Sequence, residues 1–164
     1  MRYFDFTIDG KRVGYYEIDE RPGLLYANAR LLVEGEVREH PFWVRHVDER
    51  PTEVRVGAAS WQPVPADAYP TSAYPFVVRR GLERYRALVE GTLELDEREL
   101  RSEDGLIVER SGGRVTRAFD VRAGVIVRID WGGGAESRLV ASFEEATRGT
   151  AFEAPRRGPP CGTC

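Results

Sequence analysis

The first third of the chain alternates apolar and polar residues with a period of two, which is typical of half-buried β-strands. Phe4, Phe6 and Ile8 alternate with polar neighbours, and Asp9-Gly10 then supplies the residues of a hairpin turn. Short connections between such strands favour an antiparallel meander. The strands expected in this part are residues 3–9, 12–20, 24–35, 37–47 and 53–57.

The second half of the chain repeats this pattern and shows it most clearly after residue 106. Val125, Val127, Ile129 and Trp131 form one continuous apolar face. Residues 97–104 are highly charged, and we expect them to be exposed. The segments with strand character are residues 82–90, 91–96, 106–110, 114–121, 125–131 and 137–143.

About ten antiparallel strands exceed what an open twisted sheet holds flat. The predicted fold is therefore mainly β, a single antiparallel meander curled into a half-barrel or barrel. The segment between the two runs of strands contains prolines 63, 65, 70 and 75, which remove backbone donors and interrupt a regular sheet. Its aromatic residues favour an ordered crossing that closes one side of the sheet, and are Trp61, Tyr69, Tyr74 and Phe76.

A short helix over residues 74–82 fits the end of the crossing, with Ser72 as N-cap and Pro75 in the first turn. The pattern predicts one β domain over residues 1–146. It consists of a strand meander at 3–57, the crossing at 61–80 and a second meander at 82–143. Residues 147–164 are expected to be a C-terminal tail.

The composition and charge of the chain exclude several classes of function. The chain has 164 residues, of which 41% are hydrophobic and 31% charged, as in soluble globular domains. A net charge of −3 lacks the basic footprint of nucleic-acid binding, so no such partner is expected. No apolar run approaches the length of a membrane span, and the N-terminus lacks the pattern of a secretory signal. We therefore expect a cytoplasmic protein.

Motifs of catalysis are not evident in the sequence. There is no GxSxG, P-loop or HExxH motif, which favours a binding protein over an enzyme and predicts no cofactor or metal. Cys161 and Cys164 form a terminal CxxC that is either an inert tail, a redox or thiol-transfer site, or half of a metal site. His40 and His46 share a strand face but lie about 20 Å apart, too far to bind one metal unless the strand bends.

Arg117 is the most informative charged residue, because it shares the inward parity of Val115 and Phe119. A guanidinium on an apolar face must be paired, lie at the mouth of a cavity or bind an anionic ligand group. Glu109 on the preceding strand is a candidate partner. A salt bridge, a bulge that turns Arg117 outward and an anion-anchoring role all remain open. The aromatic residues that either line a ligand cavity or pack in the core are Trp43, Trp61, Tyr69, Tyr74, Phe76 and Trp131.

The hairpin pattern runs from Asp9-Gly10-Lys11-Arg12-Val13-Gly14 through Val108-Glu109-Arg110 and Arg117-Ala118-Phe119 to Ile129-Asp130-Trp131. It resembles the β-meander half-barrel proteins, which include lipoprotein carriers and glycolipid-binding families. The resemblance implies a curved antiparallel sheet wrapped around a helix or lid, with an apolar groove for an acyl chain.

These observations lead to one main hypothesis and two alternatives. The main hypothesis is a non-catalytic module that binds an apolar or amphipathic, lipid-like small molecule on the concave face, with Arg117 as headgroup anchor. The first alternative is a thiol or redox accessory protein that uses Cys161 and Cys164. The second is a scaffold or protein-interaction domain that uses exposed sheet edges.

Overall fold

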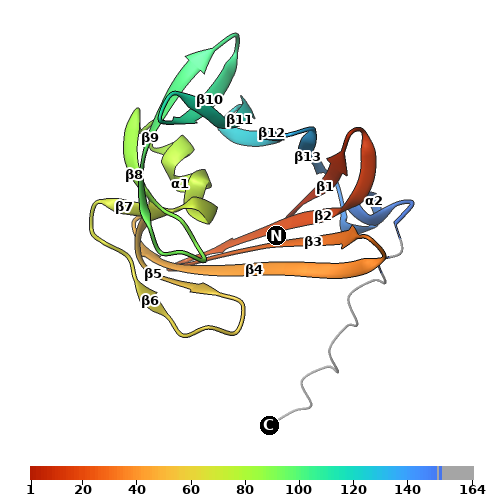
Figure 1. Ribbon diagram of the computed structural model, residues 1–164, viewed down its shortest axis with the longest axis horizontal. Coiled ribbons are helices and arrows are strands. Elements are labelled where there is room, and N and C mark those ends of the chain that lie inside the picture. Colours follow the sequence, from red (N-terminus) through yellow and green to blue (C-terminus); the bar gives the residue numbers. More distant parts are fainter. Residues whose placement is uncertain (151, 153–164) are drawn as a thin grey trace.

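The computed structural model describes residues 1–150 and 152, and there thirteen strands form one curved sheet (Figure 1). Neighbouring strands are antiparallel except for the pair at one end, β7 and β8, which is parallel. The predicted fold class is therefore confirmed, with more strands than the sequence indicated. The strand order is β6-β5-β4-β3-β2-β1-β13-β12-β11-β10-β9-β8-β7.

The first meander follows the sequence prediction closely, and three of its four turns contain a glycine, whereas the turn between residues 47 and 50 has positive φ at Asp48 and Glu49. Positive φ at Asp9 and Gly10, for example, closes the first hairpin. The last strand begins at Arg50, three residues earlier than predicted. The strands are β1 (Arg2–Ile8), β2 (Lys11–Arg21), β3 (Leu24–Val33), β4 (Glu36–Val47) and β5 (Arg50–Val56).

The second meander contains a strand that the sequence did not predict. Residues 97–104 were expected to be exposed and were not assigned to a strand, but most of them belong to β9. The strand tolerates its charge because neighbouring strands supply partners, such as Arg84 for Glu99 and Arg110 for Glu103. The strands are β8 (Arg84–Leu88), β9 (Leu95–Glu103), β10 (Leu106–Ser111), β11 (Arg114–Arg122), β12 (Val125–Gly132) and β13 (Ala135–Val140).

The two meanders join through β1 and β13, which pair along their length, so the two ends of the chain's β region lie at the middle of the sheet. The crossing joins the two outer ends of the sheet. It contributes β6 (Gln62–Pro63), which pairs with β5, and β7 (Ala68–Pro70), which pairs with β8. Curling brings β7 into contact with β5, but β6 and β7 do not pair, so the described sheet is not closed.

The crossing also provides the helix that fills part of the concave side. A 3₁₀ turn, η1 (Thr71–Ala73), leads into α1 (Tyr74–Arg79), which lies within the curve of the sheet (Figure 1). Pro75 occupies the first turn as predicted, but the N-cap is Ala73, without a side-chain hydrogen bond, and not Ser72. The helix ends earlier than predicted, because the chain turns at Gly81, where φ is +61°.

The core lies between the concave face of the sheet and α1. Inward-facing side chains of both meanders pack there against Tyr74, Phe76 and Val77 of the helix. The apolar face predicted for residues 125–131 is wrong in part. A register shift between Asp120 and Val121 turns Ile126 inward, whereas Val125 is exposed. The largest fully buried strand residues are Phe4, Ile18, Leu25, Val44, Val54, Phe119 and Ile129.

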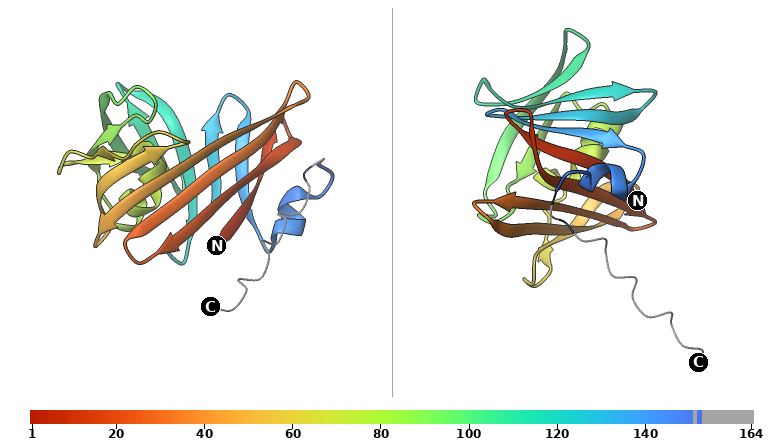
Figure 2. Two further views of the ribbon diagram at one scale, coloured as in Figure 1. Left: turned by 90° about the horizontal axis from the view of Figure 1, so that it is seen from below. Right: turned by 90° about the vertical axis from the view of Figure 1, so that its right-hand side faces the viewer.

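A second helix corrects the prediction of a strand ending at residue 143. Ser142 instead caps α2 (Phe143–Thr147) by accepting a hydrogen bond from the backbone N–H of Glu145 at 3.2 Å. The helix lies on the outside of the curved sheet, against β1, β2 and β13 (Figure 2). Phe143 packs there between Tyr3 and Tyr15.

Candidate ligand-binding cavity

The concave side holds a cavity of about 310 Å³ between the N-terminal end of α1 and the sheet. Its walls come from both meanders and from the crossing, so no single segment of the chain forms it. The apolar and aromatic lining residues are Phe6, Tyr16, Ala29, Leu31, Phe42, Tyr74 and Trp131. The remaining, polar lining residues are His40, Thr71, Ser72, Glu90 and Arg117.

Aromatic contacts give the cavity a packed wall. Trp131 stacks on Phe6 with ring centroids 6.4 Å apart and meets Tyr16 and Tyr74 edge-on at 5.7 and 5.9 Å. Its indole N–H donates to the Ser137 hydroxyl at 2.9 Å, which holds the ring in place. Edge-to-face and offset-stacked rings are the favoured arrangements of aromatic pairs. The apolar wall is therefore held by contacts within the protein.

Arg117 reaches the cavity from β11, and its guanidinium is paired with Glu109 of β10. Nε donates to Oε2 and Nη2 to Oε1 of Glu109, both at 2.8 Å. Nη1 donates to the backbone carbonyl of Thr71 at 3.0 Å, which ties η1 to the sheet. Of the alternatives left by the sequence, the salt bridge is present, and Arg117 lines the cavity as well.

The Glu109 carboxylate has further donors, although its residue is fully buried. Oε2 accepts hydrogen bonds from Arg98 and from the Thr116 hydroxyl, each at 2.7 Å, and Oε1 accepts one from the Tyr85 hydroxyl. A buried carboxylate needs such partners to remain ionised. Arg98 also pairs with Asp96 at 3.0 Å, so the ionic cluster is balanced in charge.

Burial and pairing act in opposite directions on the pKa values of this cluster. Burial alone raises the pKa of Glu109, but the Arg117 charge and the hydrogen bonds from Arg117, Tyr85 and Thr116 outweigh it and lower the pKa to about 2. Burial lowers the pKa of Arg117, and Glu109 more than compensates, so its pKa is raised. Burial also raises the pKa of Tyr85. The ion pair therefore stays charged at neutral pH.

Glu90 is the carboxylate that lines the cavity, just beyond the end of β8. It accepts hydrogen bonds from the Thr71 hydroxyl and from the backbone N–H of Ser72, the latter at 2.6 Å. These bonds hold η1 in place. Within residues 1–150 and 152, Glu90 forms no ion pair, so its negative charge is not balanced by a contacting cation.

Two hydroxyls at the cavity form no hydrogen bond of normal geometry among the described residues, although the Tyr16 phenol lies next to one of them. They belong to Ser72 and Tyr74, whose exposed fractions are 8% and 1%. Burial raises the pKa of Tyr74, and the phenol of Tyr16 lies close enough to raise it further. Burial likewise raises the pKa of Tyr16 to about 12. Buried polar groups without partners are uncommon in native proteins and call for an explanation.

The structure divides the aromatic residues predicted for a ligand site into three groups. Tyr74 and Trp131 line the cavity together with Arg117. Tyr69 and Phe76 are buried in the core but do not line the cavity. Tyr69 packs against Tyr85 at 6.1 Å, and Phe76 packs against His46 at 4.6 Å.

Trp43 and Trp61 lie on the convex face, opposite the cavity. Arg55 stacks on both rings, 4.1 Å from the centroid of Trp43 and 5.1 Å from that of Trp61, and Arg45 lies 4.2 Å from Trp61. Trp61 therefore takes neither of the two positions expected from the sequence, which were the lining of a cavity and the core. The cation–π contacts explain the position, because they let a large ring cover the sheet at its surface.

The two histidines that the sequence offered as metal ligands lie in different surroundings. His40 is exposed and lines the cavity, whereas His46 packs beside α1. No cluster of histidine, cysteine and acidic residues suited to a metal ion occurs in residues 1–150 and 152. Cys161 and Cys164 lie outside the described residues. None of the described helices has the length and apolar character needed to cross a membrane.

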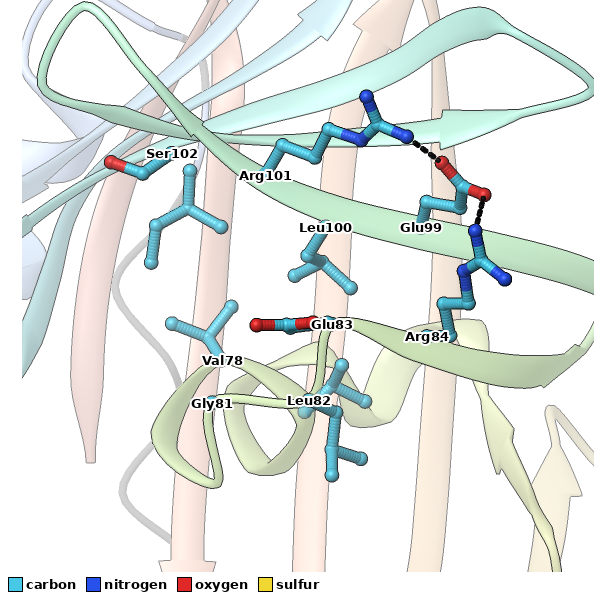
Figure 3. A pocket seen from close by; sticks show the side chains of 11 residues that line it. Val78, Gly81, Leu82, Glu83, Arg84, Glu99, Leu100, Arg101 and Ser102 are labelled. Atoms are coloured by element: carbon cyan, nitrogen blue, oxygen red, sulfur yellow. Dashed lines mark hydrogen bonds and ion pairs between the residues drawn. The ribbon is translucent and has the colours of Figure 1, made fainter.

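A second, larger hollow of about 590 Å³ lies at the other end of α1 (Figure 3). Its apolar side chains include Val78, Leu82 and Leu100, which point toward one another. Glu99 bridges Arg84 and Arg101 at 3.0 and 2.9 Å beside it. All the unpartnered buried hydroxyls lie elsewhere in the described residues, which makes the smaller cavity the better candidate.

Sequence reasoning named Tyr74, Trp131 and Arg117 among the residues that line this cavity and missed the others, including the polar residues Ser72 and Glu90. Ser72 was assigned to a helix cap, and Glu90 was placed at the end of the segment with strand character over residues 82–90, whereas β8 ends at Leu88. Comparison with known proteins found no matching family model, curated protein or solved structure. The resemblance to lipoprotein-carrier and glycolipid-binding proteins therefore stays a prediction.

Proposed function

We propose that the protein is a non-catalytic module that binds an apolar or amphipathic small molecule in the cavity beside Trp131. The observation that carries the proposal is a cavity of about 310 Å³ with a largely apolar lining, open beside the exposed His40. Pockets lined by aromatic and aliphatic side chains with a few placed polar groups are the usual form of small-molecule sites.

The size of the cavity limits the ligand. Small-molecule pockets span roughly 300–1,000 Å³, so this one is at the lower end. A short acyl chain or a single ring system suits this volume better than a whole glycolipid, whose sugar part would extend past His40 into solvent. The ligand is therefore expected to be small and lipid-like.

Native mass spectrometry of the full-length protein, followed by solvent extraction, tests this function. A bound mass that extraction releases, together with saturable binding of the neutral fluorophore N-phenyl-1-naphthylamine by the extracted protein, is the expected result. If the protein carries no co-purifying molecule and the extracted protein also shows no saturable fluorophore binding, the proposal is contradicted.

A further inference from the structure

The polar end of the cavity shows which headgroup it accepts, and Arg117 is the first element of that argument. Its Nε and Nη2 are engaged by the Glu109 carboxylate, and its Nη1 by the Thr71 carbonyl. An anionic ligand would have to compete with a fully buried carboxylate that has three other donors. Breaking a buried pair is costly because it leaves an uncompensated charge. Arg117 is thus a poor anchor for an anion.

Glu90 is the second element, because it is the cavity-lining charge without a contacting cation in the described residues. Thr71 and Ser72 supply two hydrogen bonds to its carboxylate, which leaves lone pairs that can accept more. A ligand carboxylate placed here would meet a like charge in a partly dehydrated cavity, which disfavours ionised binding. A ligand group that donates a hydrogen bond would meet an acceptor.

The unpartnered hydroxyls of Ser72 and Tyr74 are the third element. Both side chains are more than nine-tenths buried, and both residues line the cavity. A hydroxyl can donate one hydrogen bond and accept others, so each is satisfied by a group that does both. An alcohol has this property, whereas a carboxylate only accepts.

We propose that the cavity selects a ligand with an uncharged hydroxyl head on an apolar body, and that Ser72, Tyr74 and Glu90 form its head site. The hydroxyl donates to Glu90 or Ser72 and accepts from Tyr74, while the apolar body lies against Phe6, Leu31 and Trp131. Arg117 acts as a positioning residue, because it holds η1, and with it Ser72, against the sheet. This inference rests on the proposed function and names the ligand class for the same cavity.

Displacement of N-phenyl-1-naphthylamine by 1-octanol and by octanoate tests the head selection, since the two share one chain length. At about pH 7.5 the octanoate head is ionised. We expect 1-octanol to bind at least about tenfold more tightly than octanoate, which corresponds to about one decade of Kd. Equal affinities, or tighter binding of octanoate, would overturn the head assignment and leave the proposed function standing. Failure of the fluorophore to bind, together with the absence of a co-purifying molecule, would contradict both the head assignment and the proposed function.

Two variants test whether Ser72 and Glu90 cause the preference for a hydroxyl head. Ser72→Ala should weaken 1-octanol binding about threefold to tenfold, the range of one neutral hydrogen bond, and leave ethylbenzene, which has no polar head, unchanged. It removes a buried hydroxyl without a partner, so the fold should persist. A Ser72→Ala protein that binds 1-octanol as tightly as the native protein would contradict the head site.

Glu90→Gln should narrow the preference for 1-octanol over octanoate to less than about threefold, because the amide removes the like charge and can still accept a hydrogen bond. Glu94→Gln is the matched control, since Glu94 is exposed in the same connection and does not line the cavity. If both variants shift the preference equally, or neither does, Glu90 is not the discriminating charge and the head assignment fails.

Discussion

Glu109 and Arg117 stand opposite each other in the β10–β11 ladder, and two hydrogen bonds of 2.8 Å join the carboxylate to the guanidinium. The pair is buried among aromatic rings, with the guanidinium carbon 5.0 Å from the centroid of the Tyr74 ring. It connects the second meander to the crossing through the Thr71 carbonyl. The same pair therefore bears on both the stability of the half-barrel and the position of the cavity wall.

Replacing Arg117 by methionine should destabilise the protein by about 3 kcal/mol, because it leaves the buried Glu109 carboxylate with one cationic partner fewer. Urea unfolding measures the loss. The double variant Arg117→Met with Glu109→Gln should recover part of it, since the uncompensated charge is removed. Arg101→Met is the control, because its pair with Glu99 is exposed and exposed pairs contribute about 0–1 kcal/mol. Equal losses in the two single variants would contradict this role.

Acid should weaken the fold through Glu109. Its pKa is about 2 in the folded protein, below the ordinary value of 4.5, so the contributed stability is complete above about pH 5 and is lost as the pH falls toward 2. The shift corresponds to about 3 kcal/mol. Unfolding free energy measured between about pH 6 and pH 3 should therefore fall less steeply in Glu109→Gln than in the native protein. Parallel curves would show that Glu109 does not carry this dependence.

Filling the cavity should abolish ligand binding without unfolding the sheet. Ala29 lines the cavity from β3, so Ala29→Phe places a ring in the space of the ligand. We expect the affinity for N-phenyl-1-naphthylamine to fall by about tenfold or more, or about 1.4 kcal/mol. Ala118→Phe makes the same change on β11 between Arg117 and Phe119, and so on the opposite face of that strand. If both variants lose affinity for the fluorophore to a similar extent, the fluorophore does not bind in this cavity.

Tryptophan fluorescence should report the ligand through one residue. The protein has three tryptophans, of which Trp131 lines the cavity while Trp43 and Trp61 stack on arginines of the convex face. In Trp43→Phe with Trp61→Phe, addition of 1-octanol should shift the emission of Trp131 to shorter wavelength, because the ligand replaces water beside the ring. Trp131→Phe should show no shift. A shift that persists in Trp131→Phe would place binding on the convex face.

The sequence by itself determined the strands whose alternation and turns are local properties of the chain. The hairpin at Asp9-Gly10 and the inward parity of Arg117 and Phe119 follow from the period of two and from turn chemistry. Glu109 was named as a candidate partner of Arg117 because it lies on the preceding predicted strand, and the two residues do face each other in the β10–β11 ladder. Of the alternatives left open for Arg117, the salt bridge follows once the pairing register of these two strands is known.

Only the tertiary structure decided the features that depend on partners distant in sequence. The highly charged β9 is a strand because Arg84 and Arg110 of neighbouring strands pair with its carboxylates. Trp61 and Tyr74 come from one aromatic crossing, yet the curl of the sheet places one on the convex face and the other beside the cavity. Glu90 joins the site through hydrogen bonds from Thr71 and Ser72. Periodicity describes each strand alone, whereas the burial of a charge or a ring depends on what the rest of the fold places against it.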